Sequence, residues 1–157
     1  MNIHNLITER KSIRAFSTKE IADDVFIRLF EAARWAPSSM NDQPWRFIAA
    51  RRNDTTADFN LLLDCLNDSN KAWAKNGAAI ALIIAKKHHS NGFENKFSWH
   101  DVGLAIGNLS LQAMTEDLYM HQMGGFNADL ARTTFEIPDE FEPVSIIVFG
   151  YKGDPNA

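Results

Sequence analysis

The sequence predicts an α/β or α+β fold in which helices flank a mixed β-sheet, and three observations lead to this prediction. Apolar residues alternate along the chain between helical spacing and short strand-like runs. Residues 78–85 form a continuous apolar run, which is typical of a strand buried on both faces. Over residues 98–118, apolar positions repeat every three or four residues, which predicts one long central helix. Helices and strands in such alternation pack as layers around a sheet.

The first third of the chain predicts two helices and a strand. Residues 3–7 have the spacing of a short amphipathic helix. Ser17 and Glu20 match a capping box, and the apolar face that follows them continues until Pro37 ends the helix. Residues 45–50 then favour a strand.

The rest of the chain continues this alternation. Residues 59–66 return to helical spacing. The long helix over 98–118 is either a core helix or a subunit interface. Residues 120–123 predict a short strand, residues 127–134 a helix capped by its first asparagine, and residues 144–149 the last strand.

Composition limits the classes of protein that the chain can belong to. It has 157 residues with no repeat or linker, so a single domain over residues 1–157 is expected. The net charge of −4 and the pI near 5.7 argue against nucleic-acid binding. The N-terminus lacks the apolar core of a signal peptide, and no apolar run approaches the ~20 residues that span a bilayer. A single cysteine, Cys65, suits a reducing compartment, so a cytoplasmic domain without a membrane partner is expected.

Three cations and a hydroxyl lie together near the N-terminus, in the sequence Arg10-Lys11-Ser12-Ile13-Arg14. In extended chain, residues 10, 12 and 14 share one side. Arginine side chains bind phosphate through charge-assisted and often bidentate hydrogen bonds. The segment therefore predicts either a phosphate site or a solvated basic patch.

A polar loop joins the second predicted helix to the first strand. Between Pro37 and Pro44 it carries neutral donors and acceptors: Ser38, Ser39, Asn41 and Gln43. Such groups suit a polyhydroxyl chain or the edge of a heterocycle better than a metal ion. The alternative is an ordinary capped loop.

A pair of glycines, Gly124 and Gly125, follows the predicted strand over residues 120–123. Glycine lets the backbone approach a ligand closely or adopt positive φ. The alternative is a simple turn.

Histidines and the cysteine offer weaker signals. His88, His89, His100 and His121 form no recognised zinc spacing, so no metal site is expected. His88 and His89 are expected in a solvated loop. Cys65 is expected to be a core residue.

Segments in the same order resemble the nitroreductase family of FMN-dependent flavoproteins over nearly the whole chain. They are residues 9–16, 32–45, 101–105, 108–109, 111–113, 123–126, 137–138 and 149–151. The resemblance implies a nitroreductase-like α+β fold. It also implies an intertwined homodimer with two FMN sites, each lined by both subunits.

The resemblance assigns cofactor-binding roles to particular positions. Arg10 and Ser12 match the positions that hold the FMN phosphate and ribityl chain, and Arg14 matches a cation near the pyrimidine edge. Lys11 is also expected to bind the cofactor. The other subunit contributes Pro37, Ser38, Ser39 and Asn41, with Gln43 close behind. Asn70 matches a family asparagine, and the main chain of Gln122, Met123, Gly124 and Gly125 faces the isoalloxazine ring.

The implied activity is hydride transfer from NADH or NADPH, through flavin N5, to a small organic acceptor such as a nitroaromatic or a quinone. The kinetics are expected to be ping-pong, with no catalytic side chain. Candidate substrate contacts are His121 and Phe97. The alternatives are a non-catalytic FMN-binding or sensing domain, or a flavin-fragmenting or dehalogenating relative on the same fold.

One departure from the family lies at the C-terminus. Many members continue past the last strand with a basic segment that helps to bind the phosphate and wraps around the partner. The present sequence stops at Ala157. Weaker retention of FMN than in longer relatives is therefore expected.

Overall fold

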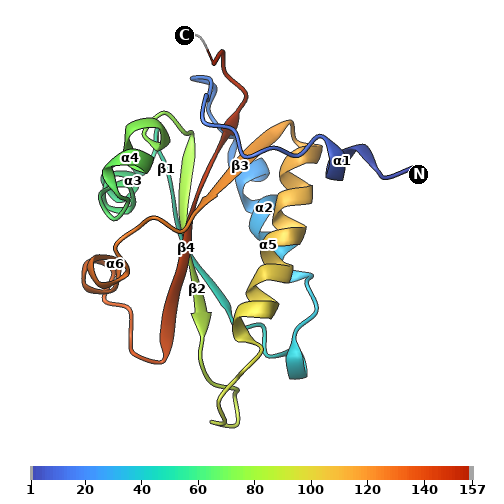
Figure 1. Cartoon of the computed structure of the whole chain (residues 1–157), viewed down its shortest axis with the longest axis vertical. Coiled ribbons are helices and arrows are strands. Elements are labelled where there is room, and N and C mark those ends of the chain that lie inside the picture. Colours follow the sequence, from blue (N-terminus) through green and yellow to red (C-terminus); the bar gives the residue numbers. More distant parts are fainter. Residues whose placement is uncertain (1, 156–157) are drawn as a thin grey trace.

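A four-stranded sheet forms the centre of the structure, a computed structural model that describes residues 2–155 (Figure 1). The strands are β1 (Trp45–Arg51), β2 (Ala79–Lys86), β3 (Leu118–Met123) and β4 (Phe141–Tyr151). Their order is β1-β2-β4-β3, and every pair is antiparallel. The α+β class is confirmed, but the sheet is antiparallel rather than mixed, because β2 runs against both β1 and β4, and β3 runs against β4.

Helices cover both faces of this sheet (Figure 1). One face carries α2 (Asp23–Arg34) and α5 (Ser98–Thr115). The other carries α3 (Thr56–Asp64), α4 (Asp68–Ala74) and α6 (Ala128–Thr134). A four-residue helix, α1 (Asn5–Thr8), contacts α5 near the N-terminus of the chain. Within the described residues, no helix combines the length and the apolarity that crossing a membrane requires.

The central strand β2 explains the continuous apolar run. Its alternate side chains enter two different cores. Ala81 and Ile83 pack with α2 and α5, whereas Ile80 and Leu82 pack with α3 and α6, and all four are 0% exposed. A strand that feeds a core on each face has no solvent side, so it needs no polar residue.

One predicted helix cap is confirmed and another is wrong. The side chain of Asn127 accepts a hydrogen bond from the Leu130 N–H (2.9 Å), which confirms that it caps α6. The predicted capping box at Ser17 does not form, because α2 begins only at Asp23. Ser17 instead donates its backbone N–H to the carbonyl of Tyr151 at the end of β4 (2.9 Å).

The solvent-facing side of α5 carries large apolar side chains and no exposed Asp, Glu, Lys or Arg. Trp99 is 56% exposed, and Leu104 and Leu111 are 37% and 38% exposed. Asp101 is the one Asp, Glu, Lys or Arg in this helix, and it is buried. An apolar stripe of this length on an otherwise charged surface is typical of a contact face.

Candidate functional site

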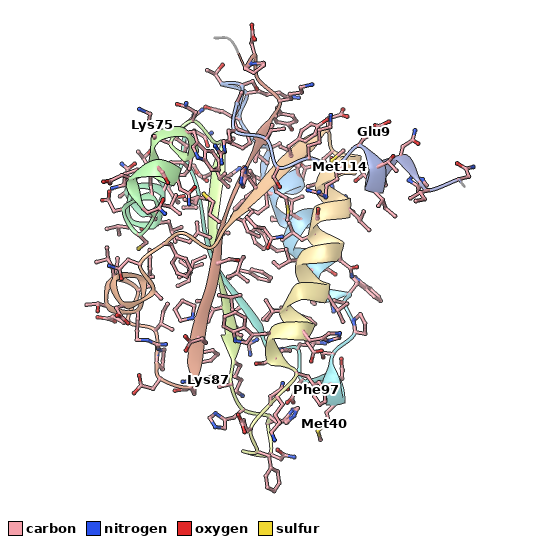
Figure 2. All side chains as sticks on the ribbon, viewed as in Figure 1. Glu9, Met40, Lys75, Lys87, Phe97 and Met114 are labelled. Atoms are coloured by element: carbon pink, nitrogen blue, oxygen red, sulfur yellow. The ribbon has the colours of Figure 1, made fainter. Side chains whose placement is uncertain are left out.

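Most of the residues predicted to contact a ligand lie in three segments around α5, and Asn70 contacts one of them from α4. The polar loop (residues 37–43) shares a depression with Phe97, Asp101 and Leu104 at the N-terminal end of this helix. The basic segment (residues 10–14) and the glycine turn (residues 122–125) contribute Arg10, Ser12 and Gln122 to another depression, which lies beside residues 103–110 in the middle of the helix. Figure 2 shows Met40 near the N-terminal end of α5, and Glu9, which precedes the basic segment, near its C-terminal end.

The basic segment separates two depressions. Arg10 and Ser12 line a depression of about 410 Å³ between α5 and β3, together with Gln122. Lys11 and Arg14 line a wider one of about 870 Å³ beside residues 152–155 at the C-terminus. Arg10 and Ser12 therefore share a side, as extended chain predicts, whereas Arg14 lies on the other side. In the described part of the chain, Arg10 and Ser12 have no hydrogen-bond or ion-pair partner.

A ring stack fixes the end of the basic segment. The Arg14 guanidinium lies over the Trp73 ring, 5.6 Å from its centroid, and the His121 ring packs on Trp73 at 4.5 Å between centroids. His121 Nδ1 lies 2.9 Å from the carbonyl oxygen of Ile13. Because a carbonyl only accepts, Nδ1 carries the hydrogen of this bond. His121 thus holds the segment against β3, and its contact with substrate stays a prediction.

The glycine turn is anchored on one side and open on the other. The Gly125 carbonyl accepts hydrogen bonds from the Asn67 backbone N–H and from Asn70 Nδ2, both at 3.1 Å. A Cβ at Gly125 would lie only 2.3 Å from Asn67 Nδ2, whereas a Cβ at Gly124 would meet nothing within 4 Å. The turn therefore presents open backbone at Gly124. The two residues that precede Gly124 differ in exposure: the Gln122 side chain is exposed and the Met123 side chain is buried.

Three residues of the polar loop have left-handed backbone: Met40 (φ 54°), Asn41 (φ 54°) and Gln43 (φ 48°). Each costs on the order of 1–3 kcal/mol for a non-glycine residue, so other contacts must hold the loop. Ser38 Oγ accepts the Gln43 N–H, and Asp101 Oδ2 accepts the Ser39 N–H, both at 2.9 Å. Asp101, at the start of α5, is thus the buried anchor of the loop.

Asp42 ties the polar loop to the turn after β2. Its carboxylate is hydrogen-bonded to His89 Nδ1 and accepts the Ser90 hydroxyl (2.9 Å). Burial opposes the ionisation of Asp42, but the hydrogen bonds from His89 and Ser90 outweigh it and lower its pKa. The solvated location expected for His88 is confirmed, since His88 is exposed. For His89 that expectation is wrong, because its side chain is only 9% exposed.

A third depression, of about 380 Å³, lies where the polar loop meets α5. It is lined by Pro37, Ser38, Ser39, Phe97, His100, Asp101 and Leu104. Phe97, the other predicted substrate contact, is 57% exposed here. It therefore lies beside the polar loop and not beside the basic segment of its own chain.

The histidines and Cys65 give no candidate metal or nucleophile site in the described residues. Among residues 2–155, no three His, Cys, Asp or Glu side chains are grouped to hold a metal ion. Cys65 is 1% exposed, and burial raises the pKa of its thiol, which confirms the expected core position.

Three side chains of these regions were not predicted from the sequence: Asp42, Asp101 and Ser110. Carboxylates are ordinary both in polar loops and in the first turn of a helix, so no signal distinguished Asp42 or Asp101. Ser110 carried a signal, because it places a hydroxyl beside Leu109 on the buried side of an apolar helix.

Comparisons with known proteins agree on one family. A sequence model of the nitroreductase family matches residues 7–151. A solved structure described as an oxidoreductase containing FMN is 30% identical, with a TM-score of 0.92 over 98% of this chain and 79% of its own. A nitroreductase family protein from Clostridium novyi NT is 23% identical, with a TM-score of 0.82 over 99% and 88%. A Methanothermobacter thermautotrophicus protein, whose name proposes an NADH dehydrogenase or NAD(P)H nitroreductase, is 24% identical over 98% of this chain and 79% of its own.

Proposed function

The chain belongs to the nitroreductase family, and from this premise we propose an oxidoreductase that uses FMN as cofactor and NADH or NADPH as electron donor. The solved relative at 30% identity contains FMN, which supports the cofactor. The name of the Methanothermobacter relative supports a nicotinamide donor. The donor groups around the basic segment and the glycine turn support the same cofactor.

The side chains of the smaller depression fit the phosphate end of FMN. Arg10 offers a guanidinium and Ser12 a hydroxyl, and no carboxylate lines this depression. A phosphate monoester is an anion with several acceptor oxygens, so it suits this donor set. Gly124 leaves room for a planar ring to approach the backbone. We therefore assign the phosphate to Arg10 and Ser12, and the ring to the glycine turn.

When bound, FMN would supply a two-electron carrier between a reduced nicotinamide and a small organic acceptor, such as a nitroaromatic or a quinone. Donor and acceptor would use the site in turn, so the kinetics would be ping-pong. Lys11 and Arg14 add positive charge beside this site, which favours negative charge on a neighbouring ring. Gly124 keeps a backbone N–H accessible as a donor. These roles need no nucleophilic or acid–base side chain, so no catalytic residue is assigned.

A complete site in this proposal needs two copies of the chain. The polar loop lines a depression at the N-terminal end of α5, whereas Arg10 and Ser12 line a different one beside the middle of this helix, and this separation is the observation that carries the proposal. Two α5 helices packed antiparallel about a two-fold axis would bring each polar loop to the partner's basic segment. The uncharged face with Leu104 and Leu111 suits such packing.

Anaerobic titration tests the proposed reaction. The purified protein, reconstituted with FMN, should show a flavin spectrum that bleaches on addition of NADH or NADPH. Colour should return when a nitroaromatic or a quinone is added. A protein that cannot be reconstituted with FMN contradicts the proposal. A flavin that stays oxidised under both nicotinamides would instead indicate an FMN-binding domain without turnover.

A further inference from the structure

Ser110 is a buried hydroxyl without a hydrogen-bond partner. Its residue is 7% exposed, and its Oγ finds no partner in the described chain. A serine inside a helix often bonds back to the carbonyl four residues earlier, which here belongs to Ile106, but no such bond is present. A buried polar group left unpaired costs about 1–3 kcal/mol, so a hydroxyl kept in this position calls for a partner.

The surroundings of Ser110 indicate the chemistry of that partner. Ser110 lines the depression of about 410 Å³ that also holds Arg10, Ser12 and Gln122. Four polar side chains from three segments therefore meet around one space: the basic segment, α5 and β3. None is a carboxylate, and one is a cation, so the space suits an anion with several acceptor oxygens.

Among the described residues, one other buried side-chain atom has no hydrogen-bond partner, but it does not face a depression near the basic segment. Asn95 Nδ2 also lacks a partner in the described chain. The oxygen of the same side chain accepts the Phe97 N–H (3.0 Å) at the turn before α5, and Asn95 lines none of the depressions around the basic segment. Among residues 2–155, only Ser110 combines an unpaired buried donor with an open polar space.

We propose that Ser110 is an FMN-binding residue whose Oγ–H donates a hydrogen bond to the phosphate group held by Arg10 and Ser12. The proposal rests on the FMN function above and extends it to α5. The phosphate would then accept hydrogen bonds from both sides of the depression, from the basic segment and from α5. Gly107, on the same helix, has open space where a Cβ would stand, so it does not obstruct the approach of the ligand.

Equilibrium binding of two flavins by Ser110→Ala tests this proposal. FMN should bind roughly ten- to a hundredfold more weakly than to the parent, as expected for loss of a hydrogen bond to a charged group. Riboflavin, which lacks the phosphate, should bind parent and variant equally. Inorganic phosphate should compete with FMN less well in the variant. Flavin fluorescence reports all three quantities without turnover.

Thermal melting without flavin gives a second readout. Ser110→Ala removes an unpaired polar atom from a buried place, so the melting temperature of the apoprotein should stay equal or rise. Ser110→Thr keeps a hydroxyl and should restore part of the FMN affinity. Thr133→Ala on α6, whose hydroxyl bonds only to the Asp129 carbonyl (3.0 Å), should leave FMN affinity unchanged.

Three results would overturn the assignment of Ser110. One is an FMN affinity equal to that of the parent. Another is an equal loss of affinity for riboflavin, which would place the hydroxyl near another part of the flavin. The third is dissociation of the dimer by Ser110→Ala in size-exclusion chromatography. A parent protein that binds no FMN would instead contradict the proposed function itself.

Discussion

Gly124 and Gly125 are neighbours in the chain but are glycine for different reasons. Gly125 packs against Asn67, whose side chain caps α4 by accepting the Asn70 N–H (3.0 Å). Gly124 faces open space in the protein alone. One position is therefore set by the fold, and the other is set, in the proposed function, by the ligand.

Alanine at each glycine should separate these reasons. The added methyl group of Gly125→Ala would push the Asn67 side chain away from the N-terminus of α4, which it caps. The apoprotein should therefore lose about 1 kcal/mol of folding stability and melt roughly 2–4 °C lower. Gly124→Ala should melt like the parent but bind FMN more weakly, because its methyl group occupies the space of the ring. Calorimetry of the apoprotein and flavin titration measure the two effects. Equal FMN affinity of Gly124→Ala and the parent would argue against a ring at this turn.

At the scale of elements, the polar loop depends on contacts from outside itself. Asp101 of α5 accepts its Ser39 N–H, and the turn after β2 binds its Asp42 through His89. These contacts offset the cost of its left-handed residues. Neither carboxylate was predicted from the sequence, because the residues that they contact are distant along the chain.

The lowered pKa of Asp42 predicts how the loop responds to acid. The ionised carboxylate stabilises the folded state above the ordinary value of 3.8, and this stability is lost as the pH falls through the lower pKa of the folded protein. At about pH 5 and above, Asp42→Asn should therefore melt several degrees below the parent. This difference should shrink below pH 3.8. A difference that persists unchanged at pH 3 would mean that the charge of Asp42 does not matter.

How far the sequence predicted an element depended on the length of its pattern. The run over residues 78–85 predicted β2 within a residue, and the repeat over 98–118 predicted α5, which ends three residues earlier. The seven-residue helix α4 was not predicted, since its few apolar residues give no period. Ser17 was assigned to a cap because the pairing of its backbone with Tyr151 is a long-range contact that no local pattern reports.

Some features of the candidate site could likewise be predicted from the sequence, and others could not. The resemblance marked the basic segment, the polar loop and the glycine turn, and their residues stay predictions for FMN binding. Their separation along α5 followed only from the structure, because the packing of the whole chain sets that distance. Ser110 is the one new candidate, and its importance came from an unpaired oxygen rather than from a motif.

At the scale of the whole molecule, the apolar face of α5 should control assembly. Leu104→Glu combined with Leu111→Glu places four carboxylates in the proposed dimer contact, so this double variant should be monomeric and should lose FMN. Leu61→Glu with Leu130→Glu is a matched control on the other layer, where these leucines are 43% and 41% exposed. Light scattering after size-exclusion chromatography distinguishes the two. A dimeric Leu104/Leu111 variant that retains FMN would contradict packing through this face.

Mixing two defective variants tests most directly whether each FMN site is built from two copies of the chain. Arg10→Ala impairs the basic segment, and Ser38→Ala with Ser39→Ala impairs the polar loop, so each variant alone should bind FMN weakly. After joint unfolding and refolding of an equal mixture, random pairing gives mixed dimers in which one site has both segments intact. We predict that FMN titration will then find tight binding at about a quarter of all sites. If the mixture binds no better than the separate variants, each site belongs to a single chain, which contradicts an FMN site shared by two copies.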